Sequence, residues 1–251
     1  MSVFGKALAS FGVGAAKVDT RLEKATYRQG ETVRGEVFIQ GGQTEQWIDE
    51  IYLFLVVAYH HEGTQDEYVI SEFRITDAFE ITPRETKVIP FEFQLPYDTP
   101  VTTAGCPVYL KTGLDIKMAV DPSDTDGIEV LPHPLIDEVL HVVEKIGFQL
   151  YRVEYEFDKF YSRHPFVQEY KFRPMGRFEG VLDELKLIFF PQARELDAIL
   201  LVDRKAVDLM SSMEEALDLD ERMARFHVSA KEAEHGSQLA KKIEQLIEAQ
   251  I

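Results

Sequence analysis

The chain has 251 residues, 45% of them hydrophobic, and carries a formal net charge of −17. This length allows one large or two small domains with a sizeable core. The acidity argues against nucleic acid as a partner, because phosphate binding needs clustered lysine and arginine. It also disfavours contact with anionic membranes.

The chain has one cysteine, Cys106, so no intramolecular disulfide can form and a reducing compartment is indicated. Residues 1–14 form an apolar N-terminal segment without the features of a signal peptide. Its Phe4, Leu8 and Phe11 recur at helical spacing, which suits packing on a domain or a partner better than a membrane surface. We therefore expect a cytoplasmic protein.

From residue 15 onward, apolar and polar residues alternate with the period of two that is typical of half-buried strands. The clearest runs cover residues 51–59, 89–95 and 108–120. Asp126-Gly127 predicts a tight hairpin turn into the next strand. Short strands in regular succession predict an antiparallel β-sandwich over residues 15–131.

A helix is predicted over residues 132–146, with Pro132 and Pro134 at its start and Gly147 at its end. We expect it to connect two domains, because strand patterns resume over residues 147–206. The octet Ile48–Leu55 is similar to Leu182–Phe189, which weakly suggests a duplicated sandwich.

Residues 207–251 are predicted to be helical. Ser211 with Glu214 is one candidate capping box, and Ser229 with Glu232 is another. Met213, Ala216, Leu217 and Met223 give a loose apolar stripe.

Three pieces of the chain resemble the arrestin-like sporulation-control proteins of the SpoOM family. The first covers residues 16–35 and includes the turn Arg28-Gln29-Gly30-Glu31, with Gln29 where arrestin-like proteins often have proline. The second is Pro90–Pro96, which is similar to a Phe-x-Phe-x-Leu-Pro strand. The third is Gly113–Val130, with its Leu-Asp-Ile and Asp-Pro-Ser-Asp. The order and spacing of these pieces carry the resemblance.

The resemblance implies a mainly β, arrestin-like fold. Its two tandem antiparallel β-sandwich domains, immunoglobulin-like in type, would be joined by a connecting helix and followed by C-terminal helices. It also implies a non-enzymatic scaffold or adaptor that regulates sporulation through protein–protein interactions and uses no cofactor. The identity of the partner proteins stays open. Two alternatives are a peripheral membrane or septum-associated structural protein, and a hydrolase on a β scaffold, for which no motif is present.

The acidic residues Asp121, Asp124 and Asp126 look calcium-like, but an EF-hand loop would then place Pro122 at the first ligand position and His133 at the last. Acidic residues beside glycine usually serve turn chemistry. We expect no metal site.

Asp49 and Asp183 share the parity of the inward apolar residues that follow each of them. A core-facing carboxylate needs a partner. Since arrestins hold their resting state by a polar cluster between their domains, these acids could form a comparable cluster with Arg152 or Arg177. The alternative is that both lie at frayed strand ends in water.

Leu239, Ile243, Leu246 and Ile247 form one apolar face of a final helix. Either the second domain or another copy of the chain must cover this face. The interruption at Gly236 favours self-association as a homodimer.

Overall fold

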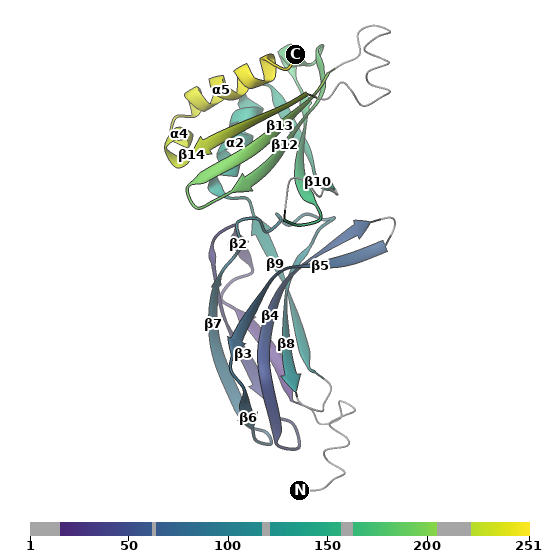
Figure 1. Cartoon of the computed structure of the whole chain (residues 1–251), viewed down its shortest axis with the longest axis vertical. Coiled ribbons are helices and arrows are strands. Elements are labelled where there is room, and N and C mark those ends of the chain that lie inside the picture. The colour runs from purple at the N-terminus through teal and green to yellow at the C-terminus, as the bar shows by residue number, and fades with distance from the viewer. Residues whose placement is uncertain (1–15, 62–63, 117–120, 157–162, 205–221) are drawn as a thin grey trace. The chain divides into compact units, whose positions relative to one another are not determined.

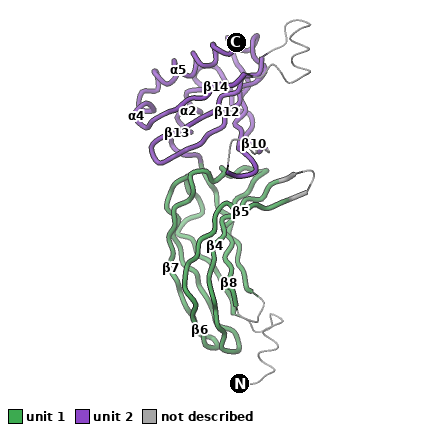
Figure 2. The backbone as a smooth tube through the Cα atoms, in the orientation of Figure 1, with its two compact units in different colours: residues 1–131 green, residues 132–251 purple. Residues whose placement is uncertain are grey.

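The computed structural model describes residues 16–61, 64–116, 121–156, 163–204 and 222–251. Strands make up most of these residues (Figure 1). The chain divides into two compact units, Met1–Leu131 and Pro132–Ile251 (Figure 2).

Unit 1 is built from two sheets. The first has the strand order β1-β3-β7 and the second the order β2-β9-β8-β4-β5, with β6 paired to β4. These strands are β1 (Lys17–Leu22), β2 (Thr26–Arg28), β3 (Thr32–Gln40), β4 (Gln46–His61), β5 (Thr64–Thr76), β6 (Phe79–Ile81), β7 (Thr86–Gln94), β8 (Val108–Ile116) and β9 (Ser123–Leu131). All pairs are antiparallel except β2–β9, which is parallel over three residues.

The two sheets of unit 1 pack face to face. Phe73 of β5 stacks on Phe93 of β7, with ring centroids 4.0 Å apart. The hydroxyls of Thr20 in β1 and Thr112 in β8 are hydrogen-bonded at 2.5 Å in the buried space between the sheets. The period-two alternation predicted most of this core, since most of the apolar residues that it placed inward are buried. They include Ile51, Leu53, Leu55, Val57, Phe91, Phe93, Leu95, Val108, Leu110 and Leu114.

The turn between β2 and β3 depends on a glycine. Gly30 has φ of 79°, and a Cβ at this position would lie 2.1 Å from the ring of Tyr97. The Glu31 carboxylate accepts a hydrogen bond from the Arg28 amide at 2.9 Å. Hydrogen bonds from Lys24 and from that amide lower the pKa of Glu31. The Gly-Glu pair of the motif therefore has a structural role, because glycine allows the left-handed backbone and glutamate satisfies a turn amide.

Replacing Gly30 by alanine should destabilise unit 1. The left-handed backbone alone costs a non-glycine residue about 1–2 kcal/mol, and the new methyl group must also displace the Tyr97 ring. Urea denaturation should show a lower midpoint for Gly30→Ala. The control is Gly127→Ala, because a Cβ there meets open space; equal midpoints for the two variants would contradict this account.

The predicted hairpin turn at Asp126-Gly127 is wrong. Both residues lie within β9, where Asp126 pairs with Leu110 and Gly127 with Tyr109. The connection from β8 to β9 occurs earlier in the chain, because the ladder already begins at the Gly113–Ser123 pair. Continuous pairing with β8 thus outweighed a local turn signal. The expected continuation of the preceding strand to residue 120 lies outside the described residues.

Three acids gather where β9 passes β1. The Asp124 carboxylate accepts a hydrogen bond from the Thr20 amide at 2.6 Å. One oxygen of half-buried Asp126 is shielded from water and has no hydrogen-bond partner among the residues that the structure describes. Burial, with repulsion from Asp124 and Asp19, raises the pKa of Asp126 to about 6. Among the described residues, no group of three or more histidine, cysteine, aspartate or glutamate side chains is placed to hold a metal ion.

The raised pKa of Asp126 predicts a pH-dependent stability. Between about pH 4 and 6, the Asp126 carboxyl binds more protons in the folded state than in the unfolded state. Its contribution to the free energy of unfolding therefore falls as the pH rises through this range. Asp126→Asn should therefore stabilise unit 1 above about pH 6, with a gain that shrinks toward about pH 4. Urea denaturation across this range tests it. The exposed Asp115→Asn on neighbouring β8 is the control, and a gain independent of pH would contradict the assignment.

The described residues of unit 2 form one antiparallel sheet with helices on one face. Its five strands follow the order β10-β11-β12-β13-β14. The strands are β10 (Phe148–Glu156), β11 (Val167–Pro174), β12 (Leu182–Pro191), β13 (Glu195–Arg204) and β14 (Arg222–Ser229), and the helices are α2 (Pro134–Lys145), α4 (Ala230–Ala233), α5 (Gly236–Glu248) and the short 3₁₀ helix η1 (Gly176–Phe178). The expectation of a second β-sandwich is thus wrong, because helices rather than another sheet bury the apolar face.

Helix α2 belongs to unit 2 and is not a free connector. It packs on β10, β12, β13 and α5. The His133 ring caps its start by accepting from the Leu135 amide, and Gly147 follows its end with φ of 111°. Burial raises the pKa of Tyr170 on β11 above its usual value, and Asp137 of α2 adds to the effect, which places the helix against this face of the sheet.

The apolar face of helix α5 is buried against other residues of unit 2. Leu239, Ile243 and Ile247 are fully buried and Leu246 is half-buried, and α5 packs against α2. The apolar stripe that suggested self-association is therefore satisfied by unit 2 itself. A homodimer through these residues would require α5 to leave its place.

The C-terminal region is not wholly helical. Residues Arg222–Ser229, including Met223 of the expected helical stripe, form strand β14. The reason is the period of two in this segment, where Ala224, Phe226 and Val228 alternate with polar residues. The capping box of Ser229 and Glu232 is confirmed at the start of α4, whereas Ser211 and Glu214 lie outside the described residues.

Candidate protein-binding surface

In the sheet of unit 2, the face opposite to α2 carries its own apolar cluster. Because residues alternate between faces, the Leu187–Leu200 pair lies on the helix side and the Ile188–Ile199 pair on the other side. The cluster on that other side consists of Val167, Ile188, Ile199 and Leu201, with half-buried Phe190 packed against it. Met223, opposite Leu201 on β14, is 48% exposed.

A shallow groove of about 520 Å³ crosses this face near β14. Phe190 and Ile199 supply apolar lining, and Asp197, Arg225 and His227 supply charged or polar lining. The remaining lining residues are Ala198 and Phe226. Apolar area beside a few polar groups that fix orientation is typical of recognition surfaces.

Toward β10 and β11 the same face has ion-paired side chains. Lys171 bonds to Glu154 and lies 3.5 Å from a carboxylate oxygen of Glu169. Burial raises the pKa of Glu169. These charges satisfy one another, so this half of the face offers less to a partner than the groove half does.

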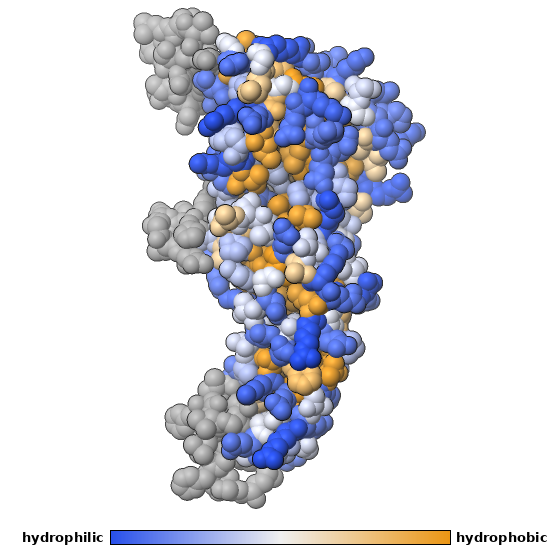
Figure 3. Space-filling view, turned by 180° about the vertical axis from the view of Figure 1, so that it is seen from behind, coloured by the Kyte–Doolittle hydropathy of each residue, from blue (hydrophilic) through white to orange (hydrophobic). Residues whose placement is uncertain are grey.

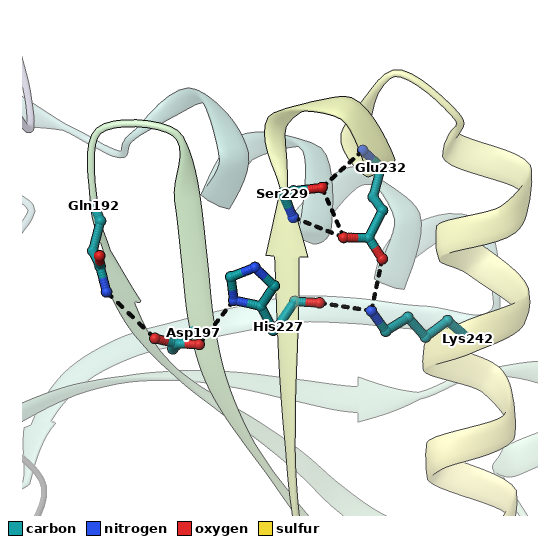
Figure 4. A network of polar contacts seen from close by, with 6 residues as sticks. All are labelled: Gln192, Asp197, His227, Ser229, Glu232 and Lys242. Carbon is teal, nitrogen blue, oxygen red and sulfur yellow. Dashed lines mark hydrogen bonds and ion pairs between the residues drawn. The ribbon is translucent and has the colours of Figure 1, made fainter.

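Polar contacts hold the groove end of the sheet in place (Figure 4). The His227 ring lies 3.0 Å from one Asp197 oxygen, and the Gln192 amide lies 3.4 Å from the other. The Lys242 ammonium of α5 donates to the His227 carbonyl at 2.7 Å and to Glu232 at 2.9 Å. Strand β14 is thereby tied to both β13 and α5.

The capping box completes this network. Glu232 accepts from the Ser229 amide at 2.9 Å and from its hydroxyl at 2.8 Å, while the Glu232 amide donates to the Ser229 hydroxyl at 3.3 Å. The hydrogen bond from the Ser229 amide, together with the one from Lys242, lowers the pKa of Glu232 to about 2. The carboxylate therefore stays charged at physiological pH.

Ser229→Ala should destabilise unit 2 by about 0.5–2 kcal/mol, the range for losing a helix N-cap. A carboxylate with a depressed pKa stabilises the fold above its unfolded pKa and loses that contribution as the pH falls through its folded value. The difference between wild type and variant should therefore shrink as the pH drops from 4.5 toward about 2. Ser229→Thr keeps the hydroxyl and serves as control. A threonine variant as unstable as the alanine variant would argue against a capping role.

The premise that Asp49 and Asp183 face the core is wrong. A β-bulge shifts the register between Ile48 and Glu50, and another does so between Leu182 and Glu184. A bulge adds one residue to a strand, which reverses the alternation beyond it. The two similar octets thus share a bulge as well as a sequence pattern.

The two aspartates have local environments. Asp49 is half-buried and accepts from the Trp47 indole at 2.8 Å, and Asp183 is exposed. Of the two arginines suggested as partners, Arg152 pairs with Glu154 at 3.1 Å. Arg177 bonds to Glu244 and Glu248 of α5 and stacks on Phe178. Within the described residues, both arginines thus pair with acids other than Asp49 and Asp183.

The groove residues Phe190, Asp197, Arg225 and His227 were not predicted from the sequence. The alternation over residues 222–229 was the available signal, since a strand there exposes Arg225 and His227 on one face. No sequence signal placed Phe190 and Asp197 beside them, because that depends on the register of three strands.

The Asp197–His227 pair resembles the orienting half of a hydrolase triad. Ser229, two residues further along β14, donates its hydroxyl to Glu232 and not to the imidazole. Cys106, the chain's one thiol, is fully buried in unit 1. Within the part of the chain that the structure describes, neither residue pairs with His227 as a nucleophile would.

Comparisons with known proteins agree on one family. The family model described as SpoOM protein matches residues 4–206. The sporulation-control protein Spo0M of Bacillus subtilis (strain 168) is 40% identical over 254 residues, covering 99% of this chain and 98% of that protein. The crystal structure of Spo0M from Bacillus subtilis aligns with a TM-score of 0.82 at 36% identity, covering 95% of this chain and all of that one.

Proposed function

This chain belongs to the SpoOM family, and we propose that it regulates sporulation as a non-enzymatic, cytoplasmic adaptor that binds other proteins. The role in sporulation control comes from the relative's name and from its similarity over nearly the whole chain. The adaptor mechanism is supported by the groove on unit 2, where an apolar lining adjoins Arg225 and His227.

The charge of the chain and the mixed character of its surface support contact with proteins over contact with lipid. The net charge of −17 opposes binding to an anionic membrane surface. No helix within the described ranges is long and apolar enough to cross a bilayer. On the face shown in Figure 3, hydrophobic patches alternate with hydrophilic residues in both units, a mixture common in transient protein interfaces.

The arrestin-like part of the proposal concerns unit 1. Its two facing sheets and the Gly30 turn support that description. Unit 2, with its sheet and covering helices, differs from a tandem sandwich. We assign the partner-binding surface to unit 2 because the groove beside Arg225 and His227 lies there.

The test is sporulation in the native host. Deleting the gene should change the number of heat-resistant spores, and the wild-type chain should reverse the change. A chain carrying Phe190→Ala and Arg225→Glu should not, because it loses apolar lining and a charged group of the groove. Immunoblotting must show equal protein levels.

Lys241→Glu is the matched control, since it makes the same charge change on an exposed position of α5 outside the groove. It should behave as wild type. Normal sporulation in the groove variant would show that the groove is not the contact surface, and normal sporulation in the deletion strain would remove the regulatory role itself.

A further inference from the structure

The groove of unit 2 crosses three neighbouring strands. The register pairs Phe190 of β12 with Asp197 of β13, and Asp197 with His227 of β14. In the adjacent row, Ile199 of β13 pairs with Arg225 of β14. Since the two rows are two residues apart along each strand, all five side chains project from the same face of the sheet. A ligand in the groove therefore meets β12, β13 and β14 in turn.

The apolar and the charged lining lie at different ends of the groove. Phe190 and Ile199 supply the apolar lining toward β12, whereas Arg225 and His227 stand on β14. Phe190 is half-buried, so part of its surface is open to a ligand. A ligand that fills the groove thus needs an apolar group at one end and a polar or charged group at the other.

The sign of that charge follows from which lining groups are already paired. One oxygen of Asp197 lies 3.0 Å from the His227 ring, and the other lies 3.4 Å from the Gln192 amide (Figure 4). Arg225 is exposed and forms no ion pair within the described ranges. Its guanidinium can be engaged without breaking one of these contacts, so the groove favours an anionic group on its ligand.

We propose that this groove binds a short extended segment of a partner protein in which an apolar side chain at i and an acidic side chain at i+2 face the sheet. The inference rests on the proposed adaptor function and specifies the partner's chemistry. The apolar side chain packs on Phe190 and Ile199, and the carboxylate pairs with Arg225. His227, held in place by Asp197, lies beside that pair.

Strand geometry sets the spacing of the two side chains. An apolar group seated between β12 and β13 lies about 1.5 strand spacings from β14, which is about 7 Å. Side chains i and i+2 of an extended segment are about the same distance apart and point to one side. Adjacent side chains point to opposite sides, so an adjacent pair cannot reach both ends of the groove at once.

Net charge favours a partner protein over a second copy of the chain. Each copy carries a net charge of −17, so two copies repel each other over their whole surfaces. An acidic side chain on a less acidic partner gains the pair with Arg225 without that repulsion.

The test titrates the full, isotope-labelled chain with unlabelled peptides and follows its amide signals by NMR spectroscopy. The probe is acetyl-Ser-Gly-Phe-Ser-Glu-Gly-Ser-amide. A second peptide has the same composition with phenylalanine and glutamate adjacent, and a third replaces glutamate by glutamine. The probe should bind at least about fivefold more tightly than either of the others. The shifted signals should centre on Phe190, Ile199 and Arg225.

Arg225→Gln should weaken binding of the probe by about fivefold and leave binding of the glutamine peptide unchanged. This combination assigns the loss to the pair between Arg225 and the carboxylate, because a damaged fold would weaken binding of both peptides. The matched control is Arg222→Gln. Arg222 is exposed on the same strand but projects from the opposite face, since it lies three residues away. This control should bind the probe as the wild type does.

Three results would overturn this assignment. They are no binding of the probe, equal binding of the probe and the peptide with adjacent side chains, and an equal loss of affinity for the probe and the glutamine peptide in Arg225→Gln. A mass in light scattering that rises with concentration in the wild type but not in Arg225→Gln would instead identify a second copy as the occupant.

The two proposals fail separately. If the probe does not bind but the chain with Phe190→Ala and Arg225→Glu still loses sporulation control, the proposed ligand is wrong and the adaptor function stands. If the probe binds as predicted but that chain supports normal sporulation, the groove is a binding site and its proposed role in sporulation is wrong.

Discussion

Burial of the apolar stripe of α5 is the interaction on which the surface of unit 2 depends. Leu239, Ile243 and Ile247 are fully buried, and removing each of them from water contributes about 1.5–3 kcal/mol. This packing holds α5 against α2 and places Lys242 beside the edge of β14. Without it, Lys242 would no longer be held beside the His227 carbonyl of β14.

The same packing decides what the other face can do. Since α2 and α5 cover one side of the sheet, the cluster around Ile188 and Ile199 lies on the side away from them. The charges near β10 are paired among themselves. At the β14 end Asp197 and His227 are paired too, and no ion pair of Arg225 is found within the described residues. The charged group that a partner could engage on this face therefore lies beside the groove.

In unit 1, the sequence features that suggest a functional site have structural roles. The Gly30–Glu31 turn and the acids around Asp126 are conspicuous in the sequence, yet both are explained by backbone geometry and strand pairing. The raised pKa of Asp126 is a consequence of burial beside Asp124 and Asp19. The family resemblance rests on such structural residues. It therefore identifies a fold but does not identify a partner.

The sequence by itself determined most strands of unit 1 with most of their inward residues, helix α2 with its Gly147 stop, and the Ser229–Glu232 capping box, because each depends on contacts within a few residues. Tertiary structure decided what local patterns cannot encode. The bulges before Glu50 and Glu184 reversed the parity of Asp49 and Asp183, since a bulge is defined by the partner strand. The register of β12, β13 and β14 brought Phe190, Asp197 and His227 to one groove. The packing of α5 on α2 covered a stripe for which the sequence had favoured self-association.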